Sequence, residues 1–268
     1  MIPIYSLLTL ALLCMTVLQF FAAACQSSLL LYAAFLLLSA LVPLLILAPE
    51  RRKYRLKRKT PCARPAAEFF KVLPFFLFMT MLIAIPASYL TGGNVIEPTR
   101  ENLPFLLIGS VFLAALTEEA VFRFGALPLL AAQNRASGLL FSALLFAFAH
   151  MSLGSMLYAF PAGLILGAVT LRFGSPLPAF LLHLLNNLLS VCLLYAPHGD
   201  FLYIALLLLF FVCSLPFMYS LYKEKTLVCT VKSLRASESR AAVKAALYSP
   251  LCALFLLYLT VALLSLFS

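Results

Sequence analysis

Residues 116–123 have the sequence LTEEAVFR, which places two adjacent carboxylates and an arginine inside an apolar run that begins near Leu103. The other acidic residues of the chain lie near the ends of apolar segments or in the polar connections between them. A charged side chain at the centre of a membrane helix costs about 2.5 to 3.5 kcal/mol, so an acid in that place is a candidate functional group. Glu118 and Glu119 are therefore the first candidates for a site.

The chain of 268 residues is 64% hydrophobic and only 10% charged. Its apolar residues form repeated runs of about 20, the length that a helix needs to cross a bilayer. Because only helices and closed barrels satisfy their backbone hydrogen bonds in lipid, such runs indicate helices. We therefore predict an all-α fold, a polytopic transmembrane helical bundle of about eight to nine spans.

The helices that we predict across the membrane follow the apolar runs of the chain. They cover residues 4–24, 29–48, 72–90, 104 to about 125, 138–171 as two helices that meet near 152–155, 176–195, 201–222 and 247–267. The first run ends in AAAC at residues 22–25, which is similar to a lipoprotein cleavage site. Because the charged region that begins a signal peptide is missing, we expect this run to stay as a transmembrane helix, with cleavage as the alternative.

The basic residues behind the formal net charge of +10 are concentrated in two polar connections, 50–64 and 223–244. In a soluble protein this charge would suggest nucleic-acid binding, but basic residues gathered between membrane spans follow the positive-inside rule instead. We therefore expect no nucleic-acid partner, and we place both connections and the N-terminus in the cytoplasm. Arg135 and Arg172 fall on the same side in this topology. The connection 50–64 could also bind anionic lipid headgroups, although a role in setting the topology is the favoured interpretation.

Glu119 and Arg123 are four residues apart and lie on the same face of a helix. An ion pair between them would offset part of the cost of burying both charges. Glu118 points about 100° away from that face, so one acid can pair with the arginine while the other stays available for chemistry. The alternative is an arginine that ends the helix at the cytoplasmic interface, with both acids reaching water.

Two of the three histidines, His150 and His183, lie in apolar segments of the same half of the chain as the acids. Asn187 follows His183 by four residues and therefore shares its helical face. The third histidine, His198, lies in a predicted external turn. Each histidine by itself fits helix packing at least as well as catalysis. Together with the two acids and Arg123, however, these groups are hard to bury unless they meet around water or an ion.

A cluster of this composition has the groups needed to hydrolyse an amide. A carboxylate takes a proton from water, a histidine or a metal holds that water, and hydrogen-bond donors stabilise the oxyanion. No serine or cysteine is clearly paired with a base, which makes a covalent nucleophile less favoured.

Three short motifs contain these residues in the order Glu118-Glu119-x-x-x-Arg123, Phe146-x-x-x-His150 and His183-x-x-x-Asn187. Their order and residue types resemble the pattern of the CPBP intramembrane protease family, which includes the type II CAAX prenyl endopeptidases and the bacterial abortive-infection and bacteriocin-processing proteins. With this resemblance the chain divides into N-terminal transmembrane helices with a basic cytoplasmic loop (1–100), a CPBP-like catalytic core (101–195) and C-terminal transmembrane helices (196–268).

The resemblance implies cleavage of a peptide bond at a site that opens toward the cytoplasm. Glu118 would act as the general base on a water molecule that His150 orients, the ion pair would support the site, and His183 with Asn187 would stabilise the oxyanion. The substrate would be a membrane-associated protein or peptide, prenylated or not. The protein would be a multi-pass enzyme of the bacterial inner membrane.

A zinc ion would suit the same residues, because two histidines and a glutamate are typical ligands of a catalytic zinc. Glu118, His150 and His183 are the candidate ligands, and a metal-free mechanism in which Glu118 and His150 hold the water is the alternative. The seven cysteines contain no C-x-x-C pair, so neither a thiolate site nor a disulfide framework is expected.

Two other functions fit a buried polar cluster. A non-enzymatic immunity or scaffold protein of the same fold would use the cluster to hold its helices together. An ion-coupled transporter, which is less favoured, would use Glu118 and His150 as a proton relay, but the paired repeats typical of transporters are not visible. If the helices ran straight, His150 would lie nearer the external side than Glu118 by about 10 Å, so a shared site requires tilted or irregular helices.

Overall fold

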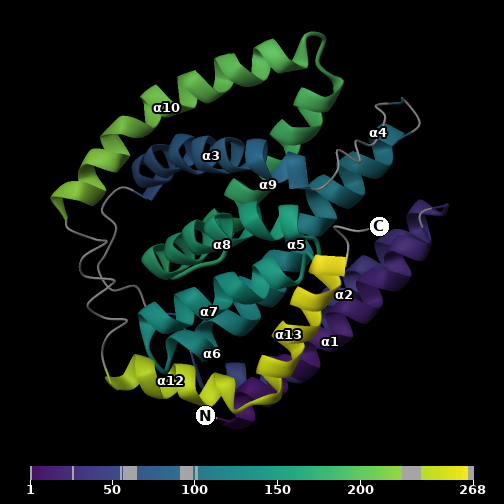
Figure 1. Ribbon diagram of the computed structural model, residues 1–268, viewed down its shortest axis with the longest axis vertical. Coiled ribbons are helices and arrows are strands. Elements are labelled where there is room, and N and C mark those ends of the chain that lie inside the picture. The colour runs from purple at the N-terminus through teal and green to yellow at the C-terminus, as the bar shows by residue number, and fades with distance from the viewer. Residues whose placement is uncertain are drawn as a thin grey trace.

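The computed structural model describes residues 2–25, 27–54, 56, 65–90, 99, 102–224 and 237–264. Within these ranges the chain is helical, has no strand, and packs into a bundle of helices (Figure 1). The all-α polytopic bundle predicted from the sequence is thereby confirmed. Parts of the two basic connections, 57–64 and 225–236, and the end of the last predicted span, 265–267, lie outside the described residues.

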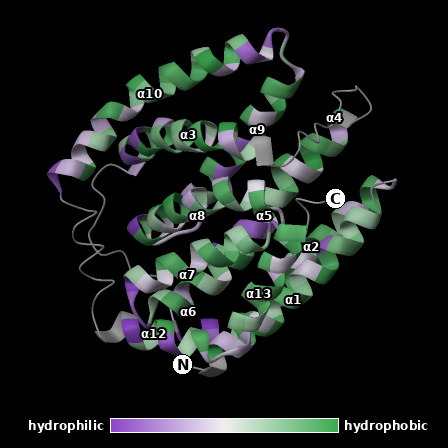
Figure 2. Cartoon of the chain, in the orientation of Figure 1, coloured by the Kyte–Doolittle hydropathy of each residue, from purple (hydrophilic) through white to green (hydrophobic). Residues whose placement is uncertain are grey.

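Seven helical segments of the described chain are long and apolar enough to cross a membrane. They are α1 (Ile2–Ala24), α2 (Leu29–Arg51), α3 (Pro65–Leu90), a composite segment (Leu103–Ala131), α8 (Leu153–Phe173), α9 (Leu177–Tyr195) and α10 (Gly199–Lys223). An eighth span results if α12 (Ser237–Leu247) and α13 (Pro250–Leu264) are counted together, with a bend of 71° between them. Most of the helical surface is hydrophobic, as lipid contact requires (Figure 2).

The predicted segment 138–171 forms two helices, but the first of them is too short to cross the membrane. This helix, α7 (Arg135–Phe148), has 14 residues. It rises about 21 Å, less than the hydrocarbon thickness of about 30 Å. The side chain of Asn134 begins α7 by accepting hydrogen bonds from the amides of Ala136 and Ser137, both at 3.0 Å. The count of spans is therefore seven or eight in the described residues; eight is the lower limit of the predicted number, and seven is one fewer.

α7 and α8 form a hairpin that enters and leaves the bundle at the same end. Met151, with a φ of 50°, turns the chain after α7, and Ser152 begins α8. At the open end, Arg135 Nη2 donates to Leu171 O at 2.5 Å. His150 therefore lies at the inner end of a short helix, and the depth mismatch expected for straight helices does not arise.

The two helices of the hairpin approach closely at Gly163. A Cβ atom at this position would lie 3.1 Å from Ala143 Cα and 3.1 Å from the Phe146 ring of α7. Small residues allow such close packing of membrane helices. The ring of Phe146 is thus held against α8, one turn before His150.

An ion pair between α8 and α3 places three helix ends at one end of the bundle. Arg172 Nη2 lies 2.8 Å from Glu68 Oε2, in the first turn of α3. Because Arg135 contacts the end of α8, both arginines lie at the end where the first basic connection joins α3. This arrangement agrees with the prediction that Arg135 and Arg172 lie on the same side of the membrane. That this side is the cytoplasmic one stays a prediction.

The composite segment that carries the acid pair is an irregular helix. It consists of α4 (Asn102–Phe105), η1 (Leu106–Leu113), α5 (Ala114–Glu119), η2 (Ala120–Ala126) and α6 (Leu127–Ala131), of which η1 and η2 are π-helical. π-helical turns are rare and frequently occur at functional sites. Here they flank the short α5 on both sides, in the middle of the bundle, where Figure 2 shows hydrophilic residues.

Two apolar clusters enclose this segment. One contains Phe122, Leu145 and Phe146 together with residues of α1, α12 and α13, and the other contains residues of α3, α8, α9 and α10 around Leu166 and Leu182. α5 contacts both α2 and α9. The acid pair is therefore held between packed helices and not at the outer surface.

Candidate active site

Glu119 and Arg123 form a buried ion pair. Glu119 Oε1 lies 3.3 Å from Arg123 Nη1, and the two side chains are 2% and 0% exposed. The guanidinium group also lies 4.2 Å above the Phe146 ring and donates from Nη2 to Gly163 O at 3.4 Å. This burial excludes the alternative in which Arg123 ends the helix at the membrane surface.

His183 of α9 connects the two glutamates. Its Nδ1 atom lies 3.0 Å from Glu119 Oε1, and its Nε2 atom lies 3.8 Å from Glu118 Oε2. Since a carboxylate accepts hydrogen bonds, Nδ1 is the donor in the first contact. The neutral imidazole then presents the lone pair of Nε2 to Glu118, so Glu119 fixes both the orientation and the tautomer of His183.

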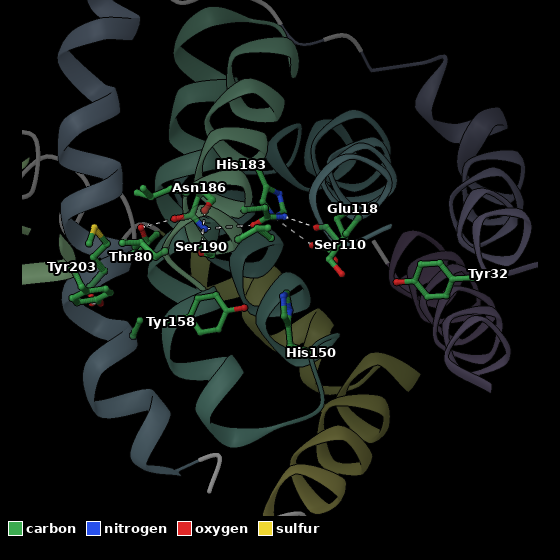
Figure 3. Close-up of a pocket in the computed structure, with 17 residues that line it drawn as sticks. Tyr32, Thr80, Ser110, Glu118, His150, Tyr158, His183, Asn186, Ser190 and Tyr203 are labelled. Carbon is green, nitrogen blue, oxygen red and sulfur yellow. Dashed lines mark hydrogen bonds and ion pairs between the residues drawn. The ribbon is translucent and has the colours of Figure 1, made fainter. Parts of the chain in front are cut away.

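Glu118 faces a cavity of about 560 Å³. The cavity is bounded by residues of α2, α3, η1, α5, α8, α9 and α10, and its polar wall includes Glu118, His150, Tyr158, His183, Asn186 and Asn187 (Figure 3). The Oε2 atom of Glu118 is buried and has no hydrogen-bond partner in the described part of the chain. A buried carboxylate oxygen without a partner is costly, so we expect water or a substrate group to bond there.

His150 reaches the same cavity from the end of α7. Its Nδ1 atom bonds to Phe146 O at 2.8 Å, which leaves Nε2 for a group in the cavity. The Phe146 ring lies edge-on to both histidine rings, with centroid distances of 4.9 Å to His150 and 5.7 Å to His183. Phe146 therefore spaces the two histidines and also packs on Arg123, which gives the four-residue spacing of Phe146 and His150 a structural reason.

Two asparagines fix α9 to its neighbours. Asn187 Nδ2 donates to Ser110 O of η1 at 3.1 Å, and Thr80 Oγ1 of α3 donates to Asn186 Oδ1 at 2.7 Å. Both asparagines line the cavity together with His183, and Figure 3 shows Asn186 near the His183 ring. These bonds position the polar face of α9 between the composite segment and α3.

The structure brings the six predicted site residues together. Four of them line the cavity, namely Glu118, His150, His183 and Asn187, while Glu119 and Arg123 lie behind it. Sequence reasoning did not select Thr80, Ser110, Tyr158 or Asn186. Of these, Asn186 had a visible signal as the neighbour of Asn187, whereas serine and threonine in apolar helices, such as Ser110 and Thr80, usually bond to their own backbone and carry little information.

The three candidate zinc ligands do not gather into a ligand set. Within the described residues, no group of three or more His, Cys, Asp or Glu side chains has an arrangement that could hold a metal ion. The Nδ1 atom of His183 is engaged by Glu119, and that of His150 by Phe146 O. We therefore derive no step through zinc, and its involvement stays a prediction for experiment.

The fold and the site define a polytopic membrane protein with a buried glutamate–histidine network that faces an internal cavity. Residues 100–189 match the model of the family described as Type II CAAX prenyl endopeptidase Rce1-like. All six predicted site residues lie inside this match, and the resemblance predicted from the three motifs is confirmed over it. The matched family is one of membrane proteases. No curated protein and no solved structure matches the chain.

Proposed function

We propose that the protein is an intramembrane endopeptidase in which Glu118 activates a water molecule to hydrolyse a peptide bond. The observation that carries the proposal is the position of Glu118, whose unpartnered Oε2 atom lies 3.8 Å from His183 Nε2 at the cavity wall. A carboxylate oxygen without a partner at the wall of a polar cavity can accept a hydrogen bond from one water molecule.

The reaction follows from the groups at this position. Glu118 takes a proton from the water while the water oxygen bonds to the carbonyl carbon of the substrate. The carbonyl oxygen becomes an oxyanion, and the C–N bond then breaks as Glu118 returns the proton to the leaving amine. No covalent enzyme intermediate is needed.

Glu119 and Arg123 hold the His183 ring in position beside Glu118. The arginine compensates the buried charge of Glu119, which in turn orients His183 toward Glu118. Orientation by a second row of hydrogen bonds is the usual way in which catalytic histidines are held. His150 is proposed to orient the water from the other motif, through its free Nε2 atom.

The remaining donors are proposed to stabilise the oxyanion. His183 and Asn187 each have one nitrogen already bonded, to Glu119 and to Ser110 O respectively. Two donors remain for the oxyanion. They are the second amide hydrogen of Asn187 and, when the His183 ring is protonated, its Nε2–H group. Each donor aimed at an oxyanion contributes about 100 to 1,000-fold to the rate.

The proposed substrate is a membrane-associated protein or peptide. The name of the matched family supports a prenylated C-terminal peptide as the first substrate to test. We also propose that the N-terminus and the basic connections face the cytoplasm of a bacterial cell, since the positive-inside rule favours that orientation.

The proposal is tested with the purified protein in lipid vesicles and two internally quenched peptides that differ only in a farnesyl group. We expect cleavage of at least one peptide, with product mass defining the bond. Parallel reactions with 1,10-phenanthroline and its non-chelating 1,7-isomer test zinc, and selective inhibition by the chelator would support a metal. If folded protein leaves both peptides intact, the protease assignment fails and the scaffold hypothesis is favoured.

A further inference from the structure

The proposed hydrolysis needs hydrogen-bond donors that stabilise the oxyanion, and the residues predicted for this purpose supply few of them. In the structure His183 Nδ1 is bonded to Glu119, and Asn187 Nδ2 is bonded to Ser110 O. Donors that stabilise a tetrahedral intermediate act best when they are already aimed at the place where the charge develops. A donor on the cavity wall that has no partner would meet this need.

Tyr158 of α8 has such a donor. Its side chain lines the same cavity as Glu118, His150 and His183, and its hydroxyl group has no hydrogen bond to any residue that the structure describes. The ring lies edge-on to His150, with centroids 6.1 Å apart and an interplanar angle of 77°. Figure 3 shows the hydroxyl turned toward His150.

The Tyr158 side chain is partly buried, and its hydroxyl group is open to the cavity. A tyrosine hydroxyl among packed helices usually bonds to a carbonyl, as that of Tyr203 does with Met81 O on the opposite wall of the cavity. On α8 itself, Gly163 O already accepts a hydrogen bond from Arg123. A hydroxyl left open toward a polar cavity fits a group that arrives with the substrate.

We propose that Tyr158 is a catalytic residue that donates a hydrogen bond from its hydroxyl to the oxyanion of the tetrahedral intermediate. This inference rests on the proposed peptidase function. As the water oxygen bonds to the carbonyl carbon, the carbonyl electron pair moves to oxygen, and Tyr158 donates to that oxygen without losing its proton. The proton removed from the water stays with Glu118 until the amine leaves.

The test compares two variants that each remove one membrane-buried hydroxyl. Tyr158→Phe keeps the ring and its contact with His150, so the fold should persist. Tyr258→Phe is the control, because Tyr258 lies on α13 outside the cavity and bonds to Thr16. We expect Tyr158→Phe to lower kcat by about 100 to 1,000-fold with little change in KM, and Tyr258→Phe to retain the parental kcat.

A second readout separates catalysis from structure. A peptide phosphinate, whose tetrahedral group imitates the intermediate, should lose affinity for Tyr158→Phe by about the same factor as kcat/KM. The affinity of the uncleaved substrate, measured in a Glu118→Gln background, should be unchanged. An unchanged kcat, or a raised KM with the parental kcat, would overturn the role of Tyr158.

The outcomes also distinguish this inference from the proposed function. If the parental protein cleaves the peptides, Glu118→Gln does not, and Tyr158→Phe retains the parental kcat, only the role of Tyr158 fails. If the folded parental protein cleaves neither the farnesylated nor the plain peptide, the proposed function fails and the role of Tyr158 fails with it.

Discussion

His183 donates from Nδ1 to Glu119 and turns Nε2 toward Glu118, so that one imidazole ring links the two adjacent glutamates. The two acids therefore have different environments although they are neighbours in the chain. Glu119 is paired with Arg123 behind the cavity, whereas Glu118 lines the cavity and has no cation as close to it among the described residues. A supporting acid and a reactive acid are separated by a single peptide bond.

The ion pair should contribute to folding as well as to activity. Arg123→Ala leaves the carboxylate of Glu119 buried without its cation, and Glu119→Gln leaves the guanidinium unpaired. Breaking a buried pair typically costs about 3 to 5 kcal/mol. We expect both variants to show a lower thermal midpoint in detergent and less folded protein. A midpoint equal to that of the parental protein for both would contradict a structural role of this pair.

The close contact between α7 and α8 gives a second prediction. Gly163→Ala would press a methyl group against Ala143 and the Phe146 ring, both 3.1 Å from the added atom. Overpacking of this kind costs about 1 to 3 kcal/mol, and displacement of Phe146 should also disturb the two histidines. We expect lower stability and lower kcat. Leu157→Ala on the exposed face of α8 is the control and should change neither strongly.

The proposed orientation can be checked with the cysteines of the two basic connections, Cys62 and Cys229, which lie outside the described residues. Arg172 pairs with Glu68 in the first turn of α3, so the start of α3 lies at the same end of the bundle as the end of α8. We expect a membrane-impermeant maleimide added to intact cells to leave both cysteines unmodified, and to modify them after the membrane is opened. Labelling of either cysteine in intact cells would show that its connection faces the outside, which would contradict the proposed orientation.

Much of the site could be predicted from the sequence because buried charges are rare in membrane helices. Glu118, Glu119 and Arg123 stand out in an apolar run, and the spacing of His183 and Asn187 already placed them on one face. The contact of Glu119 with Arg123 follows from helical geometry alone. The contact of Glu119 with His183 joins two helices, so only the folded chain reveals it.

The depth of His150 could not be predicted in the same way. Residues 138–171 form one apolar run, in which Ser152 marks a boundary but not where α7 lies in the bilayer. The position of α7 in the bundle depends on tertiary contacts, such as Gly163 against Ala143 and Arg135 against Leu171. Tyr158 was missed for a related reason: its importance lies in the missing partner of its hydroxyl, which sequence does not reveal.

The most direct test of the account is the turnover of Glu118→Gln against the quenched peptides in lipid vesicles. Glutamine keeps the shape of the side chain and can hydrogen-bond, but it cannot take a proton from water. We expect kcat to fall by about 100 to 10,000-fold while the thermal midpoint and substrate affinity stay close to the parental values. Cleavage by folded Glu118→Gln at the parental rate would contradict the assignment of Glu118 as the general base.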